Sequence, residues 1–179
     1  MESRLQELLD RQDILDCLHR YTRGVDRLDR DLILSAYHPG AIDDHGAFCG
    51  PVEEFVDWVH EFHSTRHHME HHYVTNHICE LDGDVAHTET YFIFVGQNAA
   101  GTPTTVHGGR YLDKFERRND EWRIANRVCI SEWAGGLTGA DLPNPLPRTV
   151  PGISARDKTD ASYIRPLDAF VARPPTATA

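Results

Sequence analysis

The chain has 179 residues, of which 40% are apolar, and its formal net charge is −10 at pH 7. This length and apolar content suit one domain with a hydrophobic core. The negative charge argues against nucleic acids and anionic membrane surfaces as partners, because both bind basic patches.

The first part of the chain predicts two helices. Apolar residues from Leu5 to Tyr21 recur at helical spacing, and Gly24 is expected to end this first helix. A shorter apolar pattern predicts a second helix over residues 28–36, stopped by the His-Pro-Gly sequence at 38–40.

A short strand and a third helix are expected next. Residues 41–44 suit the strand. Pro51 suits the first position of the helix, where its missing N–H costs little. The apolar stripe over residues 52–62 continues the helix, which we expect to end near His67.

Beyond residue 70 the apolar period changes from helical to alternating, which predicts an antiparallel meander. The Asp-Gly pair at 82–83 suits a tight hairpin turn. Helices followed by strands indicate an α+β fold, with a cone-shaped, curved, mixed or antiparallel sheet packed against three N-terminal helices. The mouth of such a cone is a natural ligand pocket. The expected strands are 73–81, 85–95, 105–115 and 122–133.

The end of the chain has a different composition. Glycines and prolines over residues 134–151 predict an irregular path, and residues 155–163 suit a short helix. We therefore expect one domain over residues 1–135 and an extension over residues 136–179. The extension is expected to cover the pocket or a neighbouring subunit and to end in a frayed tail.

His72 is the best single candidate for proton transfer. A histidine at the start of a strand can act as a base near neutral pH if a carboxylate orients it. Asp26, 46 positions upstream, follows the first helix and offers that carboxylate. If His72 faces inward, strict alternation places Val74, Asn76 and Ile78 on the same pocket wall. The simpler alternatives are a structural histidine and an aspartate that only caps a helix or turn.

Six histidines cluster between the third helix and the first long strand, so a metal site has to be weighed. The pairs His67 with His71 and His68 with His72 would each share a helical face only if the third helix continued that far. Glu70 is the carboxylate among them, and no His-Glu-x-x-His order is present. We therefore expect no metal site and a polar connection with one imidazole pointing into the cone. The six are His63, His67, His68, His71, His72 and His77.

Four segments together resemble the SnoaL-like branch of the nuclear transport factor two superfamily, which includes scytalone dehydratase and hexachlorocyclohexane dehydrochlorinase. They are Tyr-Thr-Arg-Gly-Val-Asp at 21–26, His-Tyr-Val-Thr-Asn at 72–76, His-Gly-Gly-Arg-Tyr at 107–111 and the segment 115–124. The resemblance covers about residues 5–135. It implies a His–Asp dyad on His72 and Asp26, and an arginine of the last strand on Arg127.

The resemblance also suggests groups that assist departure of a leaving group. Tyr21 stands where the dehydrochlorinase has a lysine, which implies a different leaving group or substrate. His107 resembles a second histidine of the dehydratase, and His45 is near the place of one of its tyrosines. Trp133 is taken as a further substrate contact, whereas Trp58 and the phenylalanines of the strands are expected mainly to pack.

These features together predict a lyase without a cofactor. It would remove a proton and perform an elimination such as dehydration, or a carbon–carbon lysis such as formaldehyde loss, on a hydrophobic cyclic or aromatic molecule. Alternatives are a ketosteroid-type isomerase, a polyketide cyclase, and a non-catalytic ligand-binding or assembly module.

The surroundings of the protein are also predicted. No apolar run approaches the ~20 residues that span a bilayer, no signal-peptide core is evident, and the four cysteines are scattered. A cytoplasmic protein with reduced thiols is expected. Large residues such as Tyr91, Phe92 and Phe94 cannot all point into one small cone, so we expect a homo-oligomer, a trimer by resemblance.

Overall fold

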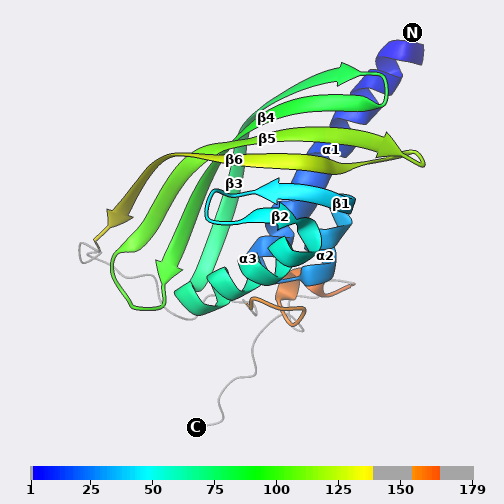
Figure 1. Ribbon diagram of the computed structural model, residues 1–179. Coiled ribbons are helices and arrows are strands. Elements are labelled where there is room, and N and C mark those ends of the chain that lie inside the picture. The colour runs from blue at the N-terminus through cyan, green and yellow to red at the C-terminus, as the bar shows by residue number, and fades with distance from the viewer. Residues whose placement is uncertain (1, 139–154, 166–179) are drawn as a thin grey trace.

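The computed structural model describes residues 2–138 and 155–165 (Figure 1). Within these residues a curved, mixed sheet of six strands packs against three α-helices, which confirms the predicted α+β class. The elements in chain order are α1 (Glu2–Asp26), α2 (Arg30–Ser35), β1 (Tyr37–Asp44), β2 (Cys49–Pro51), α3 (Val52–Arg66), β3 (His67–Asp82), β4 (Val85–Asn98), β5 (Thr104–Arg118), β6 (Glu121–Leu137) and a 3-10 turn (Ala161–Tyr163).

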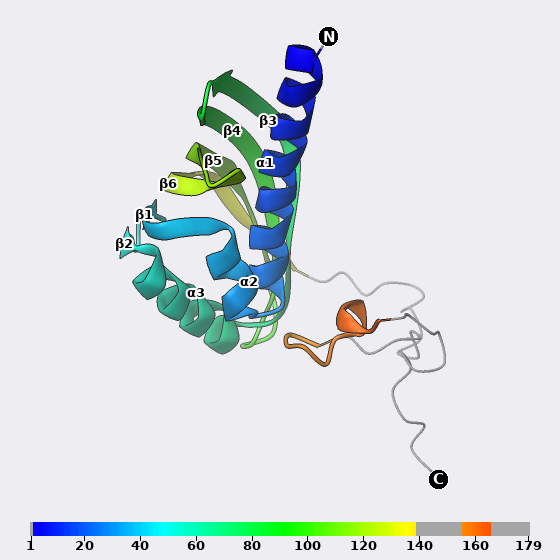
Figure 2. The ribbon, with the colours of Figure 1, turned by 90° about the vertical axis from the view of Figure 1, so that its right-hand side faces the viewer.

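The sheet has the strand order β2-β1-β6-β5-β4-β3. Strand β1 runs parallel to β6, and the other neighbouring pairs are antiparallel. Helix α1 packs along β3 and also contacts β6, whereas α3 contacts β1 and β2. Figure 2 shows α1 standing beside β3 and α3 crossing below β1 and β2, so the helices enclose one side of the bent sheet.

The interior joins one face of α1 to the inner faces of β5 and β6. Ile14, Leu18 and Tyr21 recur at helical spacing and share a buried cluster with Tyr111 and Ile124. Burial of each large apolar side chain contributes roughly 1.5–3 kcal/mol. None of the helices in the described part of the chain is long and apolar enough to cross a membrane.

Gly24 lies inside α1 and does not end it, so that prediction is wrong. The helix continues to Asp26, and a Cβ atom at position 24 would lie 2.8 Å from the backbone nitrogen of Ile33. The glycine is needed because α2 approaches α1 closely here. Asp29 then caps α2 by accepting a hydrogen bond from the Leu32 N–H at 3.2 Å.

Several other predicted boundaries shift. Residues 38–40 belong to β1, and the short strand β2 was not predicted at all. Pro51 is the N-cap of α3 and not its first residue. The histidine-rich segment is the first part of β3, which begins at His67, so the expected polar connection does not exist.

The last strand is longer than predicted. Strand β6 continues to Leu137 through two glycines that were expected to end regular structure. The predicted helix over 155–163 is reduced to the 3-10 turn. Most of the segment 134–151, predicted to close the pocket, and the predicted frayed end lie outside the described residues.

Residues 155–165 lie against the helices. Tyr163 donates a hydrogen bond to Asp29 at 2.8 Å, and Arg23 donates to the carbonyl oxygen of Ser162 at 3.1 Å. Arg156 reaches the beginning of β3, where it donates to Glu70 at 2.7 Å. This part of the predicted extension therefore contacts α1, α2 and β3.

Three of the β-bulges in the long strands decide which side chains near the cavity face inward. Each adds one residue to a strand relative to its partner, and they lie at 67–69 and 74–77 in β3 and at 131–133 in β6. An extra residue interrupts strict alternation, so the side chains beyond it change faces. The predicted pocket wall assumed alternation without such interruptions.

Candidate active site

A cavity of about 730 Å³ lies between α1, α3 and the concave face of the sheet. Its wall is largely aromatic and includes Trp58, Phe62, Phe92, Phe94 and Tyr111. Apolar walls with a few polar groups are typical of sites for small molecules. The tryptophan and the phenylalanines of the strands were expected mainly to pack, but they also line the cavity.

His72 and Asp26 form a hydrogen-bonded pair at this cavity. The distance from His72 Nδ1 to Asp26 Oδ1 is 2.7 Å, and the backbone N–H of His72 donates to both carboxylate oxygens, at 3.1 and 3.2 Å. Asp26 is the last residue of α1, and His72 belongs to β3, along which α1 packs. The structure thus brings together two residues 46 positions apart, as predicted.

The pairing gives the His72 ring a defined orientation. Because Nδ1 donates to Asp26, Nε2 is the nitrogen left for a molecule in the cavity that the ring lines. The His72 and Asp26 side chains are 8% and 13% exposed, so water weakens their interaction only slightly. Such an imidazole can accept a proton at Nε2 while the carboxylate stabilises the imidazolium that forms.

His45 forms a second histidine–aspartate pair in the same cavity. Its Nδ1 donates to Asp43, which is fully buried and also accepts a hydrogen bond from the Tyr37 hydroxyl at 2.6 Å. Burial opposes the charged imidazole, but the Asp43 carboxylate outweighs it and raises the pKa of His45 to about 9. His45 is therefore charged at neutral pH and can stabilise negative charge that develops nearby.

Tyr21 and His107 also line the cavity. The Tyr21 hydroxyl lies 3.4 Å from Nε2 of His45, and burial raises the pKa of Tyr21, so it remains a neutral donor. His107 Nε2 is 2.9 Å from the Ser131 hydroxyl. Burial, with the nearby His72 and His45, lowers the pKa of His107 and keeps it neutral.

Arg127 does not reach the cavity. It is fully buried, and its Nε and Nη2 each donate to Asp113 at 2.7 Å. Its guanidinium lies 4.1 Å from the ring centre of Tyr21 and 4.2 Å from that of Tyr111. The structure therefore places it behind these tyrosines, which it supports, and not in the expected contact with a leaving group.

Three predicted substrate contacts are absent from the cavity wall. Val74 packs against the core, and Asn76 is exposed because the bulge at 74–77 turns it away. The same bulge leaves Ile78 exposed, so the expectation that both residues face inward is wrong. Trp133 is 50% exposed, because the bulge at 131–133 separates it from the cavity-lining Ser131.

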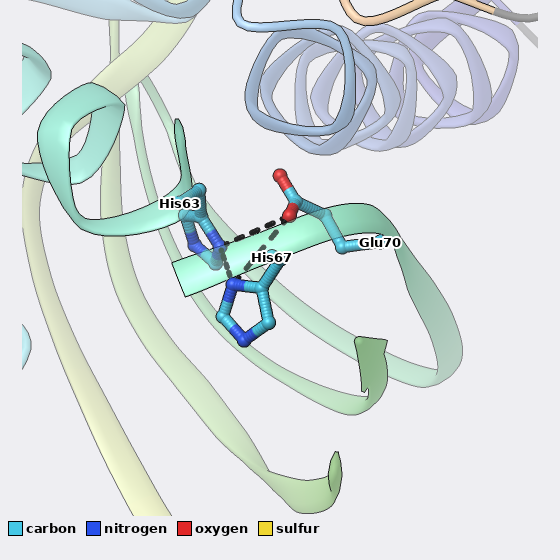
Figure 3. A group of neighbouring side chains, drawn as sticks. All are labelled: His63, His67 and Glu70. Carbon is cyan, nitrogen blue, oxygen red and sulfur yellow. Dashed lines mark hydrogen bonds and ion pairs between the residues drawn. The ribbon is translucent and has the colours of Figure 1, made fainter. Parts of the chain in front are cut away.

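A second group of polar side chains was missed. His63, His67 and Glu70 are buried together at the junction of α3 and β3, and both histidines line the cavity (Figure 3). Burial lowers the pKa of His63 to about 2 and that of His67 to about 4, so both imidazoles are neutral. One signal was present in the sequence: His63 lies four residues after Val59 on the apolar stripe of α3.

The family of the chain follows from residues 6–128, which match the model of the SnoaL-like domain. The chain belongs to the SnoaL-like family. This confirms the assignment to a branch of the nuclear transport factor two superfamily that the sequence motifs suggested. No curated protein sequence matches the chain.

Solved structures share this fold. Hexachlorocyclohexane dehydrochlorinase LinA-type3 from Novosphingobium barchaimii is 22% identical with a TM-score of 0.70, and the match covers 79% of this chain and 99% of that one. A putative scytalone dehydratase from Novosphingobium aromaticivorans is 12% identical with a TM-score of 0.65, covering 79% and 96%. The Kfla4162 protein from Kribbella flavida is 18% identical with a TM-score of 0.66, covering 72% and 95%.

Proposed function

We propose that this protein is a lyase that uses His72 as a base to start an elimination on a hydrophobic cyclic or aromatic molecule. The observation that carries the proposal is the His72–Asp26 pair, which leaves one imidazole nitrogen for a molecule in an aromatic cavity. The names of two structural neighbours, a dehydrochlorinase and a putative dehydratase, also denote eliminations.

The proposed reaction needs a base and a group that assists the leaving group. His72 Nε2 takes the proton from carbon, the electrons of that C–H bond form a double bond, and the leaving group departs with the electrons of its own bond. His45 is the candidate to stabilise the departing anion or an enolate, because Asp43 keeps it charged. Tyr21 and His107 are neutral groups that can donate hydrogen bonds in the same cavity.

The cavity wall supports an aromatic or cyclic substrate. Flat rings can pack against Trp58, Phe92 and Phe94, and aromatic pairs add roughly 0.5–1.5 kcal/mol beyond the area that they bury. A substrate with an oxygen or chlorine on the carbon next to an acidic C–H would supply both the proton and the leaving group. Carbon–carbon lysis with formaldehyde loss would use the same base on a hydroxyl proton. The O–H electrons would form the C=O bond of formaldehyde, and the electrons of the broken C–C bond would stay on the remaining carbon, which then takes the proton from His72.

The proposal is tested by screening cyclic and aromatic alcohols, β-hydroxy ketones and chlorinated rings for loss of water, chloride or formaldehyde by mass spectrometry. We expect His72→Ala to lower turnover by a factor of roughly 10² to 10⁴. His71→Ala is the matched control, because His71 is the exposed neighbour on the same strand. Unchanged turnover in a folded His72→Ala protein would overturn the proposal.

The same screen separates the alternatives. A product of unchanged mass with a moved double bond would indicate an isomerase, and a new ring would indicate a cyclase. Exchange of a ligand C–H for deuterium without any product would show that the base works but that the leaving group is absent from the panel. Tight binding with no exchange would favour a ligand-binding module.

We further propose a homo-oligomer, with a trimer as the expected state. Tyr73, Ile93, Gly108 and Trp133 are successive partners across β3, β4, β5 and β6, and the three side chains of this row are largely exposed. A partner subunit would remove this apolar row from water. A monomer in light scattering at micromolar concentration would contradict the proposal, and Tyr73→Glu with Trp133→Glu should weaken the assembly.

A further inference from the structure

Three potential metal ligands meet at one point beside the proposed base. His63 Nδ1 lies 3.3 Å from His67 Nδ1 and 3.4 Å from Glu70 Oε2, and His67 Nδ1 lies 3.6 Å from the same oxygen. Figure 3 shows the two rings and the carboxylate pointing toward one another. The three atoms thus form a nearly regular triangle.

The size of this triangle matches a tetrahedral ion. Zinc binds histidine nitrogen at about 2.0–2.1 Å and carboxylate oxygen at about 2.0–2.2 Å, so two ligands of a tetrahedral site are about 3.3–3.5 Å apart. We propose that His63, His67 and Glu70 bind a divalent transition-metal ion, and that zinc fits this set of two imidazoles and one carboxylate best.

The surroundings of Glu70 support a bound cation beside its carboxylate. Its Oε2 is buried and has no hydrogen-bond partner within the described residues, although a buried carboxylate oxygen normally has one. Its other oxygen, Oε1, accepts a hydrogen bond from Arg156 at 2.7 Å. An arginine that holds one carboxylate oxygen while the other binds the ion is the kind of outer contact that orients metal ligands.

The bulge at 67–69 makes the site possible. His67 and Glu70 are three positions apart in β3, so in a regular strand their side chains would lie on opposite faces. The extra residue turns both inward, toward His63 at the end of α3. Helical spacing of histidine pairs does not reveal this set, because it combines a residue of a helix with two residues of a bulged strand.

The position of the ion relates it to the cavity. Three protein ligands leave the fourth position of a tetrahedral ion for water or a ligand. His63 and His67 line the cavity, and the ring centres of His63 and His72 are 5.6 Å apart. An oxygen atom of a molecule in the cavity could therefore occupy the fourth position within reach of His72.

The test measures metal binding without any substrate, so its result is independent of the proposed elimination. The full-length protein is stripped with a chelator and titrated with Zn²⁺ in competition with a chromophoric chelator, and Co²⁺ replaces zinc to report geometry by its visible spectrum. We expect one ion per chain and a tetrahedral cobalt spectrum. Zinc should also raise the melting temperature, because an ion that binds the folded state stabilises it.

Two variants and a control decide the assignment. His63→Gln and the isosteric Glu70→Gln should each weaken binding by more than the roughly 10- to 100-fold that loss of an outer contact costs. Both should remove the zinc-dependent rise in melting temperature. The double variant His68→Gln, His71→Gln is the control, because these two exposed histidines lie on the same strand and should not matter.

Two results would overturn the proposal. One is a wild-type protein that binds zinc no more tightly than His63→Gln does. The other is loss of binding in the control variant with full binding in Glu70→Gln, because this would assign zinc to exposed histidines. Circular dichroism of each stripped variant checks that it is folded, and His67→Asn replaces any variant that is not.

Discussion

The Nδ1 atoms of His72 and His45 each donate a hydrogen bond to an aspartate. Asp26, the partner of His72, is partly exposed at the end of α1, whereas Asp43, the partner of His45, is fully buried in β1. Asp26 accepts hydrogen bonds from the His72 ring and from the backbone N–H of the same residue. Asp43 accepts hydrogen bonds from the His45 ring and from the Tyr37 hydroxyl, and its side chain is fully buried.

The difference shows how one type of pair can serve two purposes. Asp26 fixes the position and tautomer of a ring whose other nitrogen serves as the proposed base. Asp43 keeps a proton on His45, because a buried carboxylate is stabilised by a positive charge beside it. A charged imidazole and an imidazole with a free Nε2 thus line the same cavity.

The largest expected effect is that of Asp26→Asn on turnover. Asparagine keeps the shape but cannot stabilise the imidazolium, so turnover should fall by roughly 10² to 10⁴, as for loss of the base. The melting temperature should change little, because the amide oxygen of asparagine can still accept hydrogen bonds from the His72 ring and backbone N–H. Steady-state rates and thermal unfolding of the same preparation measure both. Full turnover in this variant would mean that the two pairs do not differ as proposed.

Arg127→Met tests whether the arginine behind the tyrosines is structural. It should lower the free energy of unfolding by about 3–5 kcal/mol, because Asp113 would remain buried without its partner. Adding Asp113→Asn should recover part of this loss by removing the uncompensated charge. Urea unfolding of both variants measures the effect. Wild-type stability with abolished turnover would instead indicate a direct role in the reaction.

Asp43→Asn should lower stability more than Asp26→Asn does. The amide keeps one acceptor oxygen, so either the Tyr37 hydroxyl or the His45 ring would face its NH2 group without an acceptor, which costs about 1–3 kcal/mol of stability. His45 should also lose its proton near neutral pH. Chemical unfolding and NMR titration of the imidazole check these outcomes. A His45 that remains charged in this variant would show that another group holds the proton.

Stability should also depend on pH through His45. Its pKa is raised from 6.5 to about 9 in the folded protein, so its contribution is complete below pH 6.5 and is lost as pH rises through 9. One proton limits the slope to about 1.4 kcal/mol per pH unit. The titratable groups around the His45 ring are Asp43, Tyr21, Tyr111 and Cys129.

Unfolding at a series of pH values, compared with His45→Gln, isolates this contribution. The variant should lose the decline between pH 6.5 and 9 while keeping any change due to other groups. An identical decline in both proteins would assign it elsewhere.

The spacing of apolar residues in the sequence was enough to predict the helices and the long strands. Ile14, Leu18 and Tyr21 repeat at helical spacing because this side of α1 is buried, whereas Leu5, Leu8 and Leu9 at the beginning of the helix are exposed. The partnership of His72 with Asp26 came from the resemblance, and the structure explains it by the packing of α1 along β3. These features depend on local pattern and on the family fold.

The errors occurred where a strand departs from alternation. Asn76 was placed on the pocket wall by strict alternation, and Trp133 was taken as a substrate contact. Bulges turn both side chains outward. The His63–His67–Glu70 group was missed because a bulge brings it together. The burial of Arg127 was not predictable, because its partner Asp113 comes from the adjacent strand and neither residue belongs to a recognisable local motif.

The bulge at 74–77 also divides β3 into two halves with separate tasks. The half before it presents His72 to the cavity, and in the half after it His77, Cys79 and Leu81 are partly buried. There the carbonyl oxygen of Cys79 accepts a hydrogen bond from Arg11 of α1. Deleting Thr75 would restore regular alternation with the same side chains facing inward on both sides of the deletion. The strand thus anchors a helix at one end and shapes a site at the other.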